Sequence, residues 1–116
     1  MGRLTTHVLD TTHGRPAGGM KIELFRVERE GPALIKTVTT NTDGRTDEPL
    51  LDGDNLFTGQ YEIVFHVGDF FAHQSGDLVR PRFLDRVPVR FGVASNQNYH
   101  VPLLCSRWSY STYRGT

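Results

Sequence analysis

Hydrophobic and polar residues alternate with a period of two along several short stretches of the chain, a pattern typical of half-buried β-strands. The clearest alternation covers residues 61–67, and a second covers residues 87–93. Pro88 lies inside the second stretch and predicts an edge strand or a bulge, because proline cannot donate a backbone hydrogen bond. Shorter strands are expected at residues 4–10, 20–24, 34–40, 98–104 and 109–113.

The strand that begins at Met20 changes phase at Phe25 and Val27, which predicts either a bulge or a strand covered on both faces. Residues 68–76 are the one stretch that suits a short helix. Segments rich in Gly, Pro, Asn and Asp separate these elements and predict turns. Seven or eight strands with one short helix predict an all-β protein, an antiparallel β-sandwich forming a single domain over residues 1–116.

The charges of the chain are balanced, with Lys and Arg totalling 13 and Asp and Glu totalling 13. Such a chain has no overall positive field to attract a phosphate backbone, so nucleic acid is not expected as a partner. No apolar run approaches the ~20 residues that cross a bilayer, and the N-terminus lacks the apolar stretch of a signal peptide. We therefore expect no membrane partner and a cytoplasmic location.

The single cysteine, Cys105, excludes an internal disulfide and suits a reducing compartment. It follows Leu103 and Leu104, so an inert core thiol is expected rather than a nucleophile. Hydrophobic residues make up 37% of the chain, which supports a modest core that oligomerisation would help to stabilise. The histidines show no spacing typical of a zinc site, and neither a G-x-S-x-G elbow nor a P-loop is present, so no metal or cofactor is expected.

Two histidines lie inside predicted strands near opposite ends of the chain, His7 in the first strand and His100 in the strand at 98–104. A strand histidine is more often a surface residue, or a core residue bonded to a carbonyl, than a catalytic group. The alternative is a general acid or base, because histidine titrates near neutral pH. The residues alone leave both interpretations open, and they do not show whether the two side chains meet.

Arg45 follows Asp43-Gly44 in a predicted loop. An arginine there is either a solvated charge or a two-pronged ligand for carbonyl and carboxylate oxygens. The last predicted strand is unusual for a chain end, since it holds two tyrosines and a β-forming pattern where chains normally fray. This predicts a tail docked in a sheet, with Tyr113 and Arg114 beside the terminal carboxylate.

Four motifs in the same order resemble the transthyretin-like proteins, and in particular the hydroxyisourate hydrolase branch of that family. They are Thr6-His7-Val8-Leu9-Asp10-Thr11 followed by Gly14-Arg15-Pro16-Ala17, Asn41-Thr42-Asp43-Gly44-Arg45, Tyr99-His100-Val101-Pro102-Leu103-Leu104, and Ser111-Thr112-Tyr113-Arg114-Gly115-Thr116. The resemblance covers essentially the whole chain. Two departures stand out, because Thr116 replaces the usual terminal Ser and Arg107-Trp108-Ser109 replaces a Pro-aromatic-Gly turn.

The resemblance implies a transthyretin-type sandwich assembled as a homotetramer, a dimer of dimers whose sites lie in the channel where two dimers meet. It implies hydrolysis of 5-hydroxyisourate to 2-oxo-4-hydroxy-4-carboxy-5-ureidoimidazoline during urate breakdown, without a metal or cofactor. By similarity, the catalytic residues are His7, Arg45 and His100, and the substrate contacts come from His7, Arg45, Ser111, Tyr113, Arg114 and Thr116.

Two other functions are compatible with such a fold. A transthyretin-like carrier would bind a small aromatic ligand in the same channel without hydrolysing it, and a β-sandwich interaction module would have no activity on urate-derived compounds. The carrier branch lacks the two histidines, the arginine and the Tyr-Arg-Gly tail, whereas this chain keeps all of them. The resemblance therefore favours the hydrolase.

Overall fold

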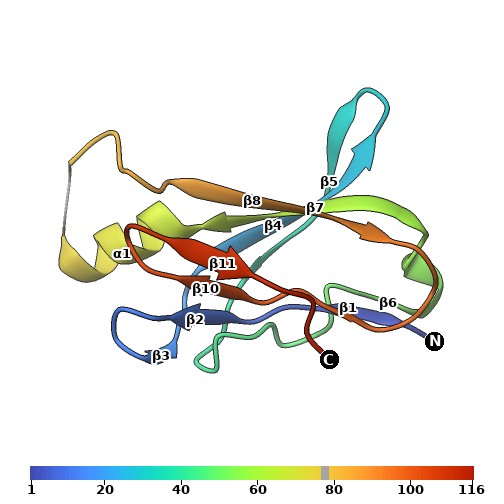
Figure 1. Ribbon diagram of the computed structural model, residues 1–116, viewed down its shortest axis with the longest axis horizontal. Helices are drawn as coiled ribbons and strands as arrows, with labels where there is room; N and C mark the ends of the chain where they lie inside the picture. The colour runs from blue at the N-terminus through green and yellow to red at the C-terminus, as the bar shows by residue number, and fades with distance from the viewer. Residues whose placement is uncertain (77–78) are drawn as a thin grey trace.

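Two β-layers enclose the core of the computed structural model, which describes residues 1–76 and 79–116 (Figure 1). Helix α1 (Val67–Ser75) directly follows the strand that ends at His66, and a short 3-10 turn, Gly53–Asn55, follows the strand that ends at Asp52. The expected all-β sandwich with a short helix is confirmed. Over the described residues the strands are β1 (Arg3–Thr5), β2 (Val8–Asp10), β3 (Arg15–Pro16), β4 (Lys21–Glu28), β5 (Gly31–Thr39), β6 (Leu51–Asp52), β7 (Gly59–His66), β8 (Arg86–Val93), β9 (Tyr99–His100), β10 (Leu103–Cys105) and β11 (Tyr110–Thr112).

The larger sheet has the strand order β5-β4-β7-β8, and its strand pairs are antiparallel. Two predictions from the sequence are confirmed there. The register between β4 and β5 shifts between Leu24 and Phe25, where the hydrophobic pattern changes phase. Pro88 lies in β8, which is one of the two edge strands of this sheet and can tolerate a residue without an N–H.

The other layer consists of two smaller sheets, β6-β1-β9 and β11-β10-β2-β3. Its strand directions depart from a purely antiparallel sandwich, because β1 pairs with β9, and β2 with β10, in parallel. The strand expected at 4–10 is divided into β1 and β2, and the strand expected at 98–104 into β9 and β10. Pro102, which has no N–H to donate, lies at the second break. Over the described residues, these divisions and the short strands β3 and β6 account for a strand count above seven or eight.

The two breaks lie beside each other and are joined by hydrogen bonds. The Val101 N–H donates to the Thr5 carbonyl at 2.9 Å, and the Thr6 hydroxyl donates to the Val101 carbonyl at 2.7 Å. Leu4 and Thr6 are buried, whereas Thr5 and His7 are only half-buried. Successive residues of an extended chain point to opposite faces, so Thr5 and His7 share the face directed away from the core.

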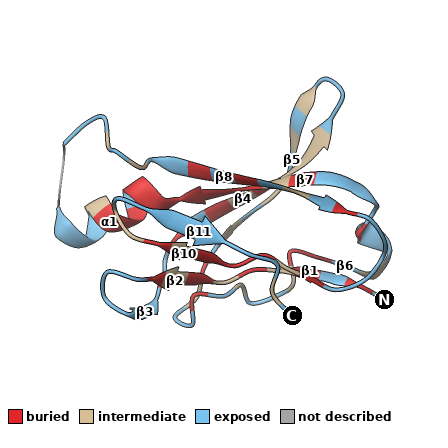
Figure 2. Ribbon diagram, viewed as in Figure 1, coloured by how far each residue is buried: buried red, intermediate tan, exposed pale blue. Residues whose placement is uncertain are grey.

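The core lies between the two layers (Figure 2). Helix α1 covers one end with its buried Phe70 and Phe71, and it ends at Gly76 in the left-handed conformation, φ 69°. No helix in the described part of the chain is long and apolar enough to span a bilayer. Fully or almost fully buried side chains come from both layers: Leu4, Val8 and Leu103 from the smaller sheets, and Ile22, Leu24, Ile63 and Phe65 from the larger one.

Candidate active site

His7 and His100 meet at the place where the two parallel strand pairs are interrupted. His7 lies between β1 and β2, and His100 is the last residue of β9. Their rings are 4.8 Å apart between centroids, and the His7 Nδ1 lies 2.7 Å from the His100 Nε2. At this distance the two nitrogens share one hydrogen. The structure therefore brings together the two histidines whose meeting the sequence could not show.

Thr5 completes a chain of three polar groups. It lies opposite His100 in the parallel pairing of β1 with β9, and its Oγ1 is 2.8 Å from the His100 Nδ1. Both ring nitrogens of His100 are consequently engaged within the protein, whereas the His7 Nε2 has no hydrogen-bond partner among the described residues. Nothing in the sequence singles out Thr5, because threonine is an ordinary strand residue and only its pairing with His100 distinguishes it.

Both histidines are held in the neutral form. Partial burial is the largest cause of a lowered pKa at His7, followed by the nearby His100 and Arg45. Partial burial also lowers the pKa of His100, and the charge of Arg45 adds to the effect. Because desolvation and a neighbouring cation both disfavour an imidazolium, each ring is expected to keep a lone pair available at neutral pH.

The loop at 41–45 places Arg45 next to His7. Val8 N–H donates to the Gly44 carbonyl at 2.8 Å, and His7 forms an isolated antiparallel bridge with Arg45. Gly44 has φ 71°, and a Cβ there would lie 2.5 Å from the Val8 carbonyl oxygen, so only glycine lets the loop come this close. The Asn41 Oδ1 accepts hydrogen bonds from Asp43 N–H at 2.9 Å and from Arg45 N–H at 3.2 Å, which fixes the loop.

The Arg45 guanidinium is available for a ligand. The residue is exposed, and its side chain forms no hydrogen bond or ion pair within the described part of the chain. A planar guanidinium with free donors binds carbonyl or carboxylate oxygens through two parallel hydrogen bonds. Beside two neutral imidazoles, it supplies a positive charge that could meet a developing oxyanion.

The C-terminal tail folds back onto the same place, as expected for a docked chain end (Figure 1). Gly115 N–H donates to the His100 carbonyl at 2.7 Å. A Cβ at Gly115 would lie 2.6 Å from the His100 Cδ2, so the tail backbone packs directly on the imidazole ring. Arg114 turns to the other side, where its guanidinium carbon lies 4.4 Å from the centre of the Tyr99 ring and its Nη2 donates to the Asn98 carbonyl at 3.4 Å.

The remaining predicted substrate contacts are exposed residues. Ser111 lies in the edge strand β11, and Tyr113 and Thr116 flank the docked part of the tail. None of the three forms a hydrogen bond or ion pair with the histidines or Arg45 within the described chain. The single chain thus brings together His7, His100, Arg45 and the tail backbone, and leaves these three side chains free at the periphery.

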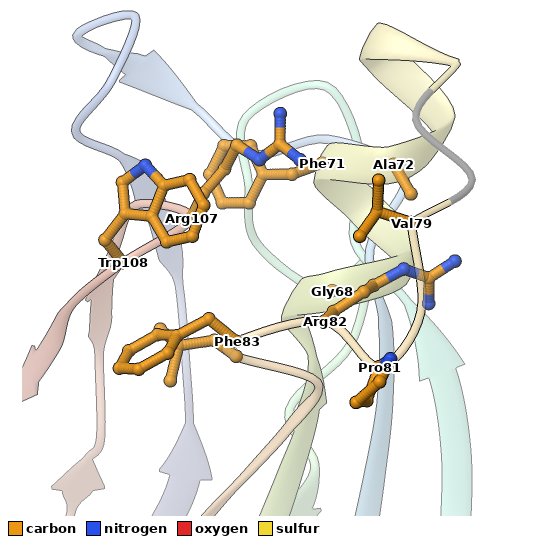
Figure 3. A pocket seen from close by; sticks show the side chains of 10 residues that line it. Gly68, Phe71, Ala72, Val79, Pro81, Arg82, Phe83, Arg107 and Trp108 are labelled. Carbon is orange, nitrogen blue, oxygen red and sulfur yellow. The ribbon is translucent and has the colours of Figure 1, made fainter.

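The histidine pair lies on an open face of the single chain. A hollow of about 700 Å³ lies elsewhere, between helix α1, residues 79–84 and the Arg107-Trp108 turn, and its walls are largely apolar (Figure 3). Another of about 760 Å³ lies against β5, β6 and the loop at 48–57. Neither is lined by His7, Arg45 or His100. Over the described residues no cluster of three or more His, Cys, Asp or Glu side chains could hold a metal ion.

Comparison with known sequences gives long and close matches. A family model described as "HIUase/Transthyretin family" matches residues 4–115. The "5-hydroxyisourate hydrolase 2" of Rhizobium meliloti is 57% identical over 99% of this chain and 97% of its own length. The "5-hydroxyisourate hydrolase" of Pseudomonas aeruginosa is 55% identical over 100% of this chain and 93% of its own length.

Solved structures also match this chain over almost its whole length. A crystal structure of (S)-allantoin synthase has a TM-score of 0.91 and is 45% identical over 99% of this chain, which spans 44% of that longer chain. The 5-hydroxyisourate hydrolase of Klebsiella pneumoniae has a TM-score of 0.81 and is 28% identical over 100% of this chain and 94% of its own. Sea bream transthyretin in complex with thyroxine has a TM-score of 0.85 over 98% of this chain and 95% of its own, but at 23% identity it shows likeness of fold alone.

Proposed function

The chain belongs to the HIUase/Transthyretin family, and on that premise we propose that it hydrolyses 5-hydroxyisourate to 2-oxo-4-hydroxy-4-carboxy-5-ureidoimidazoline during urate breakdown. The names of its near full-length relatives favour an enzyme, a hydrolase, over a carrier. The observation that carries the proposal is the neutral His7–His100 pair, joined at 2.7 Å beside Arg45.

The substrate sets three requirements. 5-Hydroxyisourate is a flat, oxygen-rich bicycle whose six-membered ring contains an acyl–nitrogen bond. Hydrolysis forms a bond between water oxygen and the acyl carbon and breaks the bond from that carbon to the ring nitrogen. The reaction needs a base for the water, a donor for the developing oxyanion and a proton for the departing nitrogen.

The His7 Nε2 is the nitrogen that fits the role of base. Of the four ring nitrogens in the pair, three take part in the hydrogen bonds with Thr5 and between the rings, and only the His7 Nε2 remains without a partner in the described chain. Its lowered pKa keeps it unprotonated at neutral pH. In this scheme His7 takes a proton from water as the oxygen attacks, and later gives that proton to the departing ring nitrogen.

Arg45 and the tail bind and orient the substrate in this scheme. The free Arg45 guanidinium binds ring oxygens and stabilises negative charge as it develops on the attacked carbonyl. Tyr113 and the Thr116 hydroxyl orient the ring, with Ser111 at the margin of the site. Arg114 contributes by anchoring the tail to Tyr99 as well as by its charge, because its guanidinium already lies over that ring.

A homotetramer, a dimer of dimers, is part of the proposal. In the single chain the histidine pair lies on an open face, and a site that excludes bulk water needs further walls. The edge strands β8 and β11 offer unpaired backbone for such an assembly, and β11 leads into the tail. A second copy of the chain would enclose the exposed Tyr113, Arg114 and Thr116 beside the pair.

Two alternatives are separated from hydrolysis by the same assay. A carrier would bind a flat aromatic ligand beside the histidines without changing it. An interaction module would show neither turnover nor any effect of shortening the tail. A cytoplasmic location, expected from the sequence, stays a prediction that cell fractionation tests.

The proposal is tested by following ultraviolet absorbance while urate oxidase generates 5-hydroxyisourate in place. The intact protein is compared with a version that ends at Thr112, and circular dichroism and size-exclusion chromatography verify that both are folded and equally assembled. We expect the intact protein to speed the decay of the intermediate well above its spontaneous rate, and the shortened one to lose that effect. Equal decay with and without the intact protein would refute the proposed activity, and the protein would then be screened for ligand binding.

A further inference from the structure

The Thr5 hydroxyl lies at the inner end of the histidine pair and has no partner other than His100 among the described residues. We propose that Thr5 is a positioning residue that hydrogen-bonds His100 in the tautomer that lets His7 act as a base. Its hydroxyl accepts a hydrogen bond from the His100 Nδ1–H, and this leaves the His7 Nε2 with the lone pair that takes a proton from water. The inference rests on the proposed hydrolysis and adds to it the group that holds the base in its reactive form.

The hydrogens can be counted along the hydrogen-bonded series Thr5, His100 and His7. Each neutral imidazole carries one N–H, and the 2.7 Å contact between the rings holds one hydrogen. If that hydrogen belongs to the His7 Nδ1, the His7 Nε2 is bare and the His100 hydrogen is on Nδ1, pointing to Thr5. If it belongs to the His100 Nε2, the His7 hydrogen is on Nε2 and His7 cannot act as a base.

The Thr5 hydroxyl can take part in either arrangement, but its role differs between them. In the first it accepts the hydrogen bond, and in the second it donates to a bare His100 Nδ1 across the same 2.8 Å. Only the first is compatible with a base at the His7 Nε2, which is the nitrogen free to meet water. It also suits the charged state, because once His7 has taken a proton the hydroxyl still accepts from the His100 Nδ1–H.

The backbone keeps the hydroxyl in place. Thr5 lies opposite His100 in the β1–β9 register, and its carbonyl accepts the Val101 N–H at 2.9 Å. The Gly115 backbone packs on the same ring, since a Cβ there would lie 2.6 Å from the His100 Cδ2. The strand register and the tail packing thus keep the Thr5 hydroxyl and the His100 ring in contact.

The experiment uses the full chain with Thr5→Val, which keeps the branched shape and removes the hydroxyl, and Thr5→Ser, which keeps the hydroxyl. Thr37→Val, an exposed position in β5, is the matched control. Two kinds of measurement are made. Kinetics give the kcat and KM for 5-hydroxyisourate. The nitrogen-15 chemical shifts of the histidine rings at neutral pH distinguish a protonated ring nitrogen from an unprotonated one.

We expect Thr5→Val to lower kcat by roughly tenfold with little change in KM, because it removes one hydrogen bond from the partly buried network that carries the positive charge when His7 is protonated. Thr5→Ser is expected to restore most of that loss, and Thr37→Val to match the unchanged protein. The nitrogen shifts should show His100 protonated at Nδ1 and His7 bare at Nε2, and this pattern should be lost in Thr5→Val.

The proposal is overturned if the shifts show His100 protonated at Nε2, or if folded Thr5→Val keeps the full kcat. The two readouts also separate this inference from the proposed function. A protein without hydrolase activity but with the expected shifts would refute the reaction while supporting the tautomer assignment. An active protein with the opposite shifts would support the reaction and refute the role of Thr5.

Discussion

A methyl group added at Gly115 tests whether the docked tail positions the histidine pair. The Cβ of Gly115→Ala would lie 2.6 Å from the His100 Cδ2 and 3.2 Å from its Cβ and Cγ. The first distance is roughly 1 Å shorter than the optimal separation of two carbon atoms, so either the tail or the ring must move by about that amount. The backbone of a strand-like bridge cannot yield at one atom only, and we expect the whole tail to shift away from His100.

The size of the effect follows from this displacement. A misplacement of about 1 Å can lower the rate by roughly 10²-fold, so we expect kcat/KM for 5-hydroxyisourate to fall by that order. The hydrogen bond from Gly115 N–H to the His100 carbonyl contributes roughly 0.5–1.5 kcal/mol, so the free energy of unfolding should fall by no more than about that amount. Kinetics with substrate generated in place and thermal unfolding followed by circular dichroism measure the two quantities separately.

Gly92→Ala is the matched control, because a Cβ at this exposed position in β8 meets no atom within 4 Å. It adds the same methyl group, and because β8 is an edge strand, size-exclusion chromatography verifies that the variant assembles normally. Its turnover should then equal that of the unchanged protein. If Gly115→Ala keeps full turnover at unchanged assembly, the tail does not position the site, and the close packing of Gly115 on His100 has no catalytic consequence.

Three further predictions concern single groups. Partial burial, together with Arg45, lowers the pKa of His7, and the base must be neutral to take a proton. As the pH falls, kcat/KM should therefore stay constant through the ordinary pKa of histidine and decline only below it. A decline centred at or above that pKa would contradict the assignment of His7 as the base. Arg114→Met should lose about 1 kcal/mol of cation–π attraction to Tyr99 and lower kcat/KM by roughly fivefold, with Arg114→Lys keeping part of it; unchanged kinetics in the Met variant would exclude tail anchoring. Burial raises the pKa of Cys105 to about 12, so iodoacetamide at about pH 8 should leave the folded protein unmodified and react after denaturation, as mass spectrometry would show.

The sequence predicts the larger sheet better than the smaller ones. Residues 87–93 alternate because one face of β8 packs on the core, and local periodicity reports that burial directly. Residues 61–67 alternate in hydropathy as well, but β7 is covered on both faces near its end, where Val64 and His66 are also buried, and Val67 already belongs to α1. The phase change at Phe25 likewise reports a real register shift. The breaks within 4–10 and 98–104 have no such signal, since the alternation of buried residues continues through Thr6 and only pairing with a distant segment interrupts the strand.

The candidate site is non-local for the same reason. His7 and His100 are far apart in sequence and meet only through parallel pairing, which no short-range pattern specifies. The family resemblance supplied both histidines and Arg45, but it gave no order of hydrogen bonds. Thr5 was missed because its importance depends on its register opposite His100, and a threonine in a strand attracts no notice by itself.

The most direct test of the central claim is the kcat of His7→Gln for 5-hydroxyisourate, alone and combined with His100→Gln. The amide of glutamine can still form hydrogen bonds but cannot take a proton at neutral pH. If the pair activates water as one unit, His7→Gln should lower kcat by roughly 10²-fold or more, and the double variant should fall little further. A folded and assembled His7→Gln protein with near-normal kcat would contradict the account, because the reaction would then have its base elsewhere.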